Sequence, residues 1–159
     1  MLSIQGFVQA YKDILANGPN AYNTILSHLA QQNPEPCIVH CTAGKDRTGV
    51  LVALLLLLVG VEPQVIADEY SLTDLGLQHM KPLFIQRLLS NPALEGNEQG
   101  VRNMIGSRAE NMLATIKMID ERFGGAEAYM RDVAGLSEEQ IARLKKNLVA
   151  DEKAILPRS

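Results

Sequence analysis

The chain has 159 residues, of which 47% are hydrophobic and 21% charged, a composition typical of one globular domain. Its net charge of −3 and the lack of a basic stripe argue against a nucleic-acid-binding surface. No secretion signal opens the sequence, and the apolar helical run over residues 50–59 is about half of what a bilayer crossing needs. We therefore predict a single cytoplasmic domain over residues 1–150, followed by a frayed tail over residues 151–159.

Two amphipathic helices are predicted before residue 36. Residues 3–16 form the first, with Ser3 in the capping position, and residues 19–32 form the second. Because residues 1–36 carry only three charged side chains, we expect more than one face of this helical pair to be covered. The apolar positions of the two helices are Ile4, Phe7, Val8, Tyr11, Leu15, Tyr22, Ile25, Leu26 and Leu29.

The uncharged residues 37–40 predict a buried strand of a parallel sheet. No other stretch has a convincing strand pattern, and a lone parallel strand leaves its backbone groups without hydrogen-bond partners. We therefore expect an α/β fold, a phosphatase-like parallel sheet flanked by helices, that is mostly helical here. The partner strands are expected in N-terminal residues absent from this sequence, or in a second copy of the chain that exchanges strands or helices in a homodimer.

Helices are predicted for most of the remaining chain. Capping boxes formed by Ser107 with Glu110 and by Ser137 with Gln140 begin two of them. Residues 91–106 contain several glycines and an Asn-Pro pair and are predicted to be the loosest part of the chain. The predicted helices cover residues 50–59, 63–75, 108–123 and 138–149, with a short helix between Gly125 and Ala134.

Between the predicted strand and the central helix lies the motif His40-Cys41-Thr42-Ala43-Gly44-Lys45-Asp46-Arg47-Thr48-Gly49. Five residues separate Cys41 from Arg47, the arrangement found in the phosphate-binding loop of cysteine-dependent phosphatases. A loop of this length at a helix N-terminus can turn successive backbone N–H groups inward and create an anion site. The residues predicted to bind the phosphate of a substrate are Thr42, Ala43, Gly44, Lys45 and Thr48.

Cys41 and Arg47 are the predicted centre of the chemistry. The planar guanidinium of Arg47 matches two phosphate oxygens at once. A free thiol has a pKa near ~8.5, and a helix N-terminus with neighbouring cations lowers it to about 3.5–7.5, which would make Cys41 a nucleophilic thiolate. Gly44 lets the backbone approach the phosphate, and Thr48 is placed to donate a hydrogen bond to the sulfur.

Asp46 is the nearest candidate for the acid that protonates the leaving oxygen. In the alternative interpretation, Asp46 orients the loop amides or pairs with Lys45, and the acid lies on a movable loop elsewhere. The sequence leaves both interpretations open.

Other chemistries that use similar motifs are excluded. A Walker-type loop would need glycine where Val39 stands, and its Gly-Lys would not be followed by Asp. Cys37 and Cys41 would be about 13 Å apart on a strand at ~3.3 Å per residue, beyond the limit of about 7 Å for a disulfide. A catalytic metal would need clustered Asp and His residues, and the sequence contains no such cluster. We therefore expect neither a metal nor a cofactor.

The loop motif resembles that of the protein tyrosine phosphatase superfamily, and most closely its branch of bacterial and fungal tyrosine/serine and lipid phosphatases with Lys-Asp between Gly and Arg. The stretch from Glu110 to Val149 is similar to the C-terminal helices of that branch, so the resemblance covers roughly residues 35–149. It implies that Cys41 is the nucleophile, that Arg47 binds phosphate, and that Lys45 and Asp46 serve broad specificity and acid catalysis.

The resemblance also bears on two later segments. Residues 76–90 correspond to a segment that covers the active site as a mobile lid in family members, whereas a core helix is the plain alternative. Asp68-Glu69-Tyr70 is similar to an acidic-aromatic patch in the family. For Tyr70, packing with a satisfied hydroxyl is favoured over contact with substrate.

The sequence therefore predicts a cysteine-dependent phosphatase that hydrolyses phosphate monoesters through a phosphocysteine intermediate. The expected monoester is phosphotyrosine, with phosphoserine and phosphothreonine as further candidates. The expected partner is a phosphorylated protein or a phosphoinositide that serves as substrate. Two alternatives stay open: a phosphatase of phosphoinositides or inositol phosphates, and an inactive phosphate-binding regulatory module.

Overall fold

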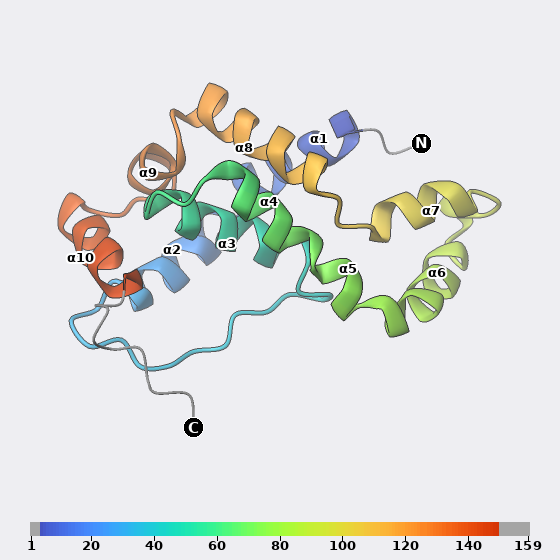
Figure 1. The fold of residues 1–159 in the computed structure, drawn as a ribbon, viewed down its shortest axis with the longest axis horizontal. Helices are drawn as coiled ribbons and strands as arrows, with labels where there is room; N and C mark the ends of the chain where they lie inside the picture. Colours follow the sequence, from blue (N-terminus) through green and yellow to red (C-terminus); the bar gives the residue numbers. More distant parts are fainter. Residues whose placement is uncertain (1–3, 150–159) are drawn as a thin grey trace.

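The computed structural model describes residues 4–149, and within this range the chain folds into helices joined by loops (Figure 1). No strand occurs in the described part, so the mostly helical character is confirmed while the predicted parallel sheet is not. The proposed Ser3 cap and the tail over residues 151–159 lie outside the described residues. None of the helices described between residues 4 and 149 combines the length and apolarity that crossing a membrane requires.

The central helix is α3 (Asp46–Leu58), which follows the predicted phosphate loop directly. Its apolar residues face several neighbours, and Val50 and Leu54 are fully buried. Gly49 lies close to the ring of Tyr70, where an added Cβ would come within 3.1 Å of two ring carbons. The absence of a side chain at this position therefore lets α4 approach α3. The helices that enclose the core are α1 (Ile4–Asn17), α4 (Pro63–Ser71), α8 (Ala109–Phe123) and α9 (Ala126–Ala128).

The two predicted N-terminal helices are confirmed. The first is α1, which buries Phe7, Tyr11 and Leu15 as its helical spacing predicts. The second is α2 (Pro19–Leu29), with Pro19 in its first turn, and it ends three residues before the predicted boundary at residue 32. Helix α2 packs against α10 (Glu138–Leu148), so the second helix and the last described helix lie side by side (Figure 1).

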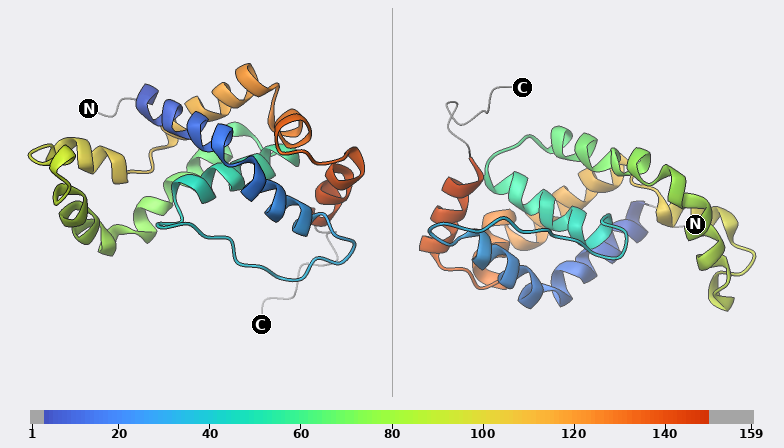
Figure 2. Two further views of the ribbon diagram at one scale, coloured as in Figure 1. Left: turned by 180° about the vertical axis from the view of Figure 1, so that it is seen from behind. Right: turned by 90° about the horizontal axis from the view of Figure 1, so that it is seen from below.

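The prediction of a buried strand at residues 37–40 is wrong. Residues 34–41 form an irregular, extended connection that runs along the outside of the helices (Figure 2). Ile38 is 91% exposed, and Val39 is only partly buried. A strand exists only as part of a ladder, and residues 4–149 contain no second strand that could pair with this one. The apolar composition that predicted burial is present without the neighbour that would cover it.

Residues 77–106, here called the helical arm, project to one side of the core (Figures 1 and 2). The arm is joined to α4 by α5 (Thr73–Gly76), and it contains two main helices, α6 (Lys81–Leu89) and α7 (Glu98–Ile105). No residue of α6 is buried, so the interpretation of this segment as a core helix is wrong. Two short 3₁₀ turns, η1 (Gln78–Met80) and η2 (Pro92–Leu94), precede and follow α6.

The prediction that residues 91–106 are the loosest part of the chain missed helix α7. Asn97 precedes this helix, and its side-chain oxygen accepts a hydrogen bond of 3.0 Å from the backbone N–H of Gly100. Gly100 is buried, and an added Cβ would lie within 2.7 Å of the Asn97 side chain. Helix α7 therefore begins with a side-chain cap that the glycine-rich composition obscured.

The C-terminal helices follow the predicted boundaries closely, with one correction. The capping box at Ser137 and Gln140 is confirmed at the start of α10. The box predicted at Ser107 is wrong, because α8 begins at Ala109 and the Ser107 hydroxyl donates instead to Asp74 at 3.0 Å. Two consecutive glycines with positive φ end α8, and α9 continues into a π-helical turn, η3 (Tyr129–Val133).

Leu54→Ala is expected to lower the free energy of unfolding by about 2–5 kcal/mol, because it leaves a cavity at a fully buried site in α3. Denaturant unfolding followed by circular dichroism measures this change. Leu75→Ala is the matched control at a position that is 69% exposed, and it should change the free energy by less than about 0.5 kcal/mol. Equal losses in the two variants would contradict a core centred on α3.

Candidate functional site

The loop from Cys41 to Lys45 curls directly into the first turn of α3. Gly44 has φ +65°, a left-handed conformation that a residue with a side chain adopts only with strain. The first helical hydrogen bond runs from the Gly49 N–H to the Lys45 carbonyl at 2.9 Å. The backbone N–H groups of the loop and of the first helical turn are therefore gathered at the N-terminus of a helix of 13 residues.

The sulfur of Cys41 accepts hydrogen bonds from this part of the backbone. Partial burial would raise the pKa of the Cys41 thiol, but hydrogen bonds from the hydroxyl and N–H of Thr48 and from the N–H groups of Ala43 and Gly44 outweigh it and lower the pKa to about 7. Within residues 4–149 the buried Thr48 hydroxyl makes no hydrogen bond of ordinary geometry, so it is free to donate to a thiolate at Cys41, which lowers the pKa of that thiol. The thiolate is thus substantially populated at neutral pH.

Arg47 lies on the same turn as these donors. Its exposed guanidinium donates from Nη2 to the Thr42 hydroxyl at 2.9 Å, which joins the two ends of the loop. Its carbonyl accepts a hydrogen bond of 2.8 Å from the buried Tyr22 in α2. The ring of Tyr22 in turn packs edge-on against the buried Tyr129. Helix α2 therefore fixes the backbone at Arg47 while the side chain stays accessible.

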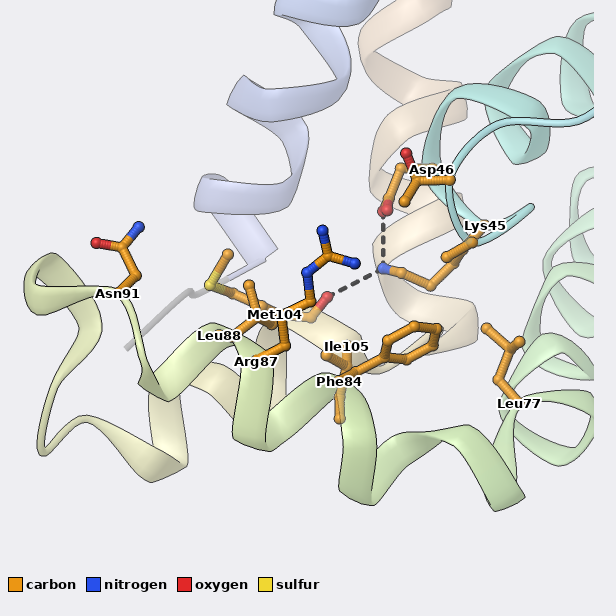
Figure 3. A pocket seen from close by; sticks show the side chains of 11 residues that line it. Lys45, Asp46, Leu77, Phe84, Arg87, Leu88, Asn91, Met104 and Ile105 are labelled. Atoms are coloured by element: carbon orange, nitrogen blue, oxygen red, sulfur yellow. Dashed lines mark hydrogen bonds and ion pairs between the residues drawn. The ribbon is translucent and has the colours of Figure 1, made fainter.

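Lys45 is 4% exposed, and its ammonium faces away from solvent. Its Nζ donates to the carbonyls of Met104 and Gly106 at 3.0 and 3.2 Å and lies 2.7 Å from Oδ1 of Asp46 (Figure 3). These contacts tie the loop to the last turn of α7 at the base of the helical arm. The predicted contact between Lys45 and a bound phosphate would require exchange of these hydrogen bonds, and it stays a prediction.

Asp46 is held by the body of the protein as well as by Lys45. Its Oδ1 accepts a hydrogen bond of 2.8 Å from the hydroxyl of Tyr11 in α1, and that hydroxyl also hydrogen-bonds the hydroxyl of Tyr70 in α4. Burial raises the pKa of Tyr11, and the neighbouring Asp46 adds to this effect, so the phenol stays protonated and acts as a donor. The favoured interpretation of Tyr70, a packed ring with a satisfied hydroxyl, is confirmed.

The role of Tyr11 beside the loop was missed by the sequence analysis, which placed it only on the apolar face of the first helix. A buried tyrosine needs a partner for its hydroxyl, and this requirement was the available signal. The partner, Asp46, lies 35 residues away along the chain, so only the fold identifies it.

A pocket of about 440 Å³ opens between the loop and the helical arm (Figure 3). The loop contributes Thr42, Ala43, Lys45 and Asp46 to its wall. The other side is mostly apolar and carries one arginine. The residues contributed by the arm are Leu77, Phe84, Arg87, Leu88, Asn91, Met104 and Ile105.

The predicted site residues are therefore neighbours in one short loop, and each makes contacts within the site or its walls. Cys37 and Cys41 are both free, and Cys37 is exposed outside the loop. Among residues 4–149, no three His, Cys, Asp and Glu side chains gather closely enough to hold a metal ion.

The chain belongs to the tyrosine phosphatase family, whose model matches residues 2–150. It is similar to a tyrosine-protein phosphatase of Nostoc commune, with 31% identity over 144 residues that make up 88% of this chain and 48% of the relative. It is also similar to a triple specificity protein phosphatase of Mycobacterium tuberculosis, with 31% identity over 118 residues, or 69% of this chain and 42% of the relative. The chain thus spans about half the length of these curated relatives.

Thr48→Ala is expected to raise the pKa of Cys41 from about 7 toward the ordinary value near ~8.5, because it removes a hydrogen bond to the thiolate. The pH dependence of alkylation by iodoacetamide in a Cys37→Ser background measures this pKa. Thr24→Ala, which removes an exposed hydroxyl on α2, is the control and should leave the midpoint unchanged. An unchanged midpoint in Thr48→Ala would show that the Thr48 hydroxyl does not stabilise the thiolate.

Proposed function

We propose that this protein is a cysteine-dependent phosphatase that hydrolyses phosphate monoesters through a phosphocysteine intermediate. The observation that carries the proposal is the Cys41 sulfur, which accepts hydrogen bonds from Ala43, Gly44 and Thr48 at the N-terminus of α3. Membership of the tyrosine phosphatase family supports the same reaction class. A thiolate that must stay reduced suits the cytoplasm, where we place the activity.

The proposed reaction has two steps. The phosphate lies against the loop N–H groups and the guanidinium of Arg47, and the Cys41 thiolate attacks phosphorus opposite the leaving oxygen. A sulfur–phosphorus bond forms, the bond to the leaving oxygen breaks, and that oxygen takes up a proton. Water then attacks phosphorus, and the thiolate leaves with inorganic phosphate as the product. The Thr48 hydroxyl stabilises the thiolate as it is released.

Asp46 is proposed as the acid that donates the proton in the first step. Its Oδ1 is engaged by Lys45 and Tyr11, and within residues 4–149 its Oδ2 makes no hydrogen bond. Asp46 lines the pocket next to the loop, where a leaving group would lie. In the alternative role, Asp46 only orients the loop through Lys45, and the contacts of Oδ1 suit that role equally well.

The proposed substrate is a phosphotyrosyl protein, with phosphoserine and phosphothreonine as further possible substrates. A mostly apolar pocket beside the loop suits an aromatic leaving group. The phosphoinositide alternative depends on Lys45 as a second cation in the site, and that ammonium is engaged by two carbonyls and a carboxylate. The structure therefore favours the first class.

Two further alternatives are separated by direct measurements. An inactive phosphate-binding module would bind vanadate without releasing phosphate from para-nitrophenyl phosphate. A homodimer with exchanged elements is suggested by the exposed apolar residues Cys37 and Ile38, and the mass of the native protein in solution tests it.

Cys41→Ser is expected to reduce the hydrolysis of para-nitrophenyl phosphate by about 10⁴-fold or more, since the nucleophile is lost, while phosphate still binds to the loop. Release of para-nitrophenol and calorimetric binding of phosphate are the measurements. Cys37→Ser is the matched control and should retain activity, because Cys37 lies outside the loop. The wild-type rate should be inhibited by vanadate and insensitive to chelators, and substantial hydrolysis by Cys41→Ser would overturn the mechanism.

In the wild-type protein, kcat/KM should rise with pH as Cys41 ionises near pH 7. Asp46→Asn is expected to lower kcat by about 10²–10⁴-fold for substrates with poor leaving groups, because it removes the proposed proton donor, and much less for para-nitrophenyl phosphate, whose leaving group needs little protonation. The rates of both proteins on an alkyl phosphate and on para-nitrophenyl phosphate check this. Equal losses on the two substrates would assign the acid to another residue.

A further inference from the structure

We infer that the pocket between the loop and the helical arm binds the leaving group of the substrate, and that Arg87 binds a second acidic group on it. The inference rests on the proposed phosphatase function and names its substrate class more closely. The preferred substrate is a phosphotyrosyl peptide in which an acidic side chain adjoins the phosphotyrosine.

The walls of the pocket suit an aromatic ring. The helical arm supplies five apolar side chains to them, and Ala43 adds a small apolar surface from the loop. Phe84 and Met104 offer the flat and polarisable contacts that an aryl group prefers. The volume of about 440 Å³ leaves room beyond one ring. The five apolar residues are Leu77, Phe84, Leu88, Met104 and Ile105.

Arg87 lies on α6 one turn after Phe84, and Figure 3 shows its guanidinium extending from that helix toward the loop side of the pocket. Among the arginines of residues 4–149, six have a guanidinium that contacts a carboxylate, an amide, a hydroxyl or a ring. The guanidinium of Arg87 makes no such contact within that range. It is therefore a cation without a protein partner beside an apolar surface.

No other charged group that the structure describes near the pocket is placed to bind the second acidic group of the substrate. Lys45 is buried and its ammonium is engaged by Met104, Gly106 and Asp46, so it is not free to meet a second anion. Asp46 directs Oδ1 to Lys45 and Tyr11 and forms no ion pair with Arg87. Arg87 is thus the accessible cation of the pocket wall, and its planar fork matches a carboxylate.

The lining also favours a peptide over an inositol headgroup. An inositol ring carries a hydroxyl or phosphate on every carbon, and each of these groups loses hydrogen bonds to water against an apolar wall. A phosphotyrosine places its ring against the apolar residues, and an adjoining Glu or Asp side chain supplies the single acid that one arginine requires. The pocket therefore recognises one ring and one carboxylate.

The test compares two phosphotyrosyl peptides that differ only by Glu or Gln next to the phosphotyrosine. The wild-type protein is expected to show a kcat/KM about tenfold higher for the Glu peptide, a ratio that falls at high salt. In Arg87→Gln the ratio should fall to about one. Using the ratio cancels any general effect of the substitution on the loop. Arg102→Gln, which removes an exposed arginine paired with Glu98 on the other arm helix, should keep the wild-type ratio.

The outcomes separate this inference from the proposed function. Turnover of both peptides with equal kcat/KM, or a preference that survives in Arg87→Gln, would overturn the role of Arg87 while leaving the phosphatase function in place. The same ratio measured as dissociation constants on Cys41→Ser needs no turnover, so it tests the pocket even if hydrolysis is absent. An inositol phosphate that is hydrolysed better than both peptides, in an Arg87-dependent manner, would replace the peptide as the substrate class.

Discussion

The hydrogen bonds donated to the Cys41 sulfur are the interaction on which the site depends. They come from the hydroxyl and N–H of Thr48 and from the N–H groups of Ala43 and Gly44, all within one turn of the loop and helix. Burial opposes the thiolate, and the donors more than compensate for it, so the pKa of the thiol falls to about 7. The same inward-facing N–H groups that stabilise the sulfur anion can also donate hydrogen bonds to the oxygens of a phosphate bound next to the sulfur. The nucleophile and the cradle for its target therefore share one set of donors.

The loop is kept in this shape by a polar network that reaches three parts of the fold. Lys45 connects it to the arm through the carbonyls of Met104 and Gly106. Asp46 connects it to α1 through Tyr11, whose hydroxyl also meets Tyr70 of α4. A buried ammonium is costly unless it is paired and hydrogen-bonded, and here each requirement is met. Moving the arm would thus disturb the residues next to the nucleophile.

The sequence predicted the loop, the central helix and most helical boundaries, because those features depend on local spacing. Cys41, Arg47 and Thr48 come together through seven or eight consecutive residues, so their proximity could be inferred without the fold. The exposure of residues 37–40 could not, because burial of a strand depends on neighbours elsewhere in a sheet. Lys45 is another such case: the two carbonyls that accept from its ammonium lie about 60 residues further along the chain, and nothing local indicates them.

The extended segment over residues 34–41 has a consequence for how the protein is handled. It is the single covalent connection between the first two helices and the rest of the described chain, and most of its side chains are exposed. A protease that cuts there separates Tyr11 from Asp46 in the covalent structure but not in space, because α1 packs against α3 and α8. Such a nicked molecule would run as two bands under denaturing conditions and as one particle in native buffer.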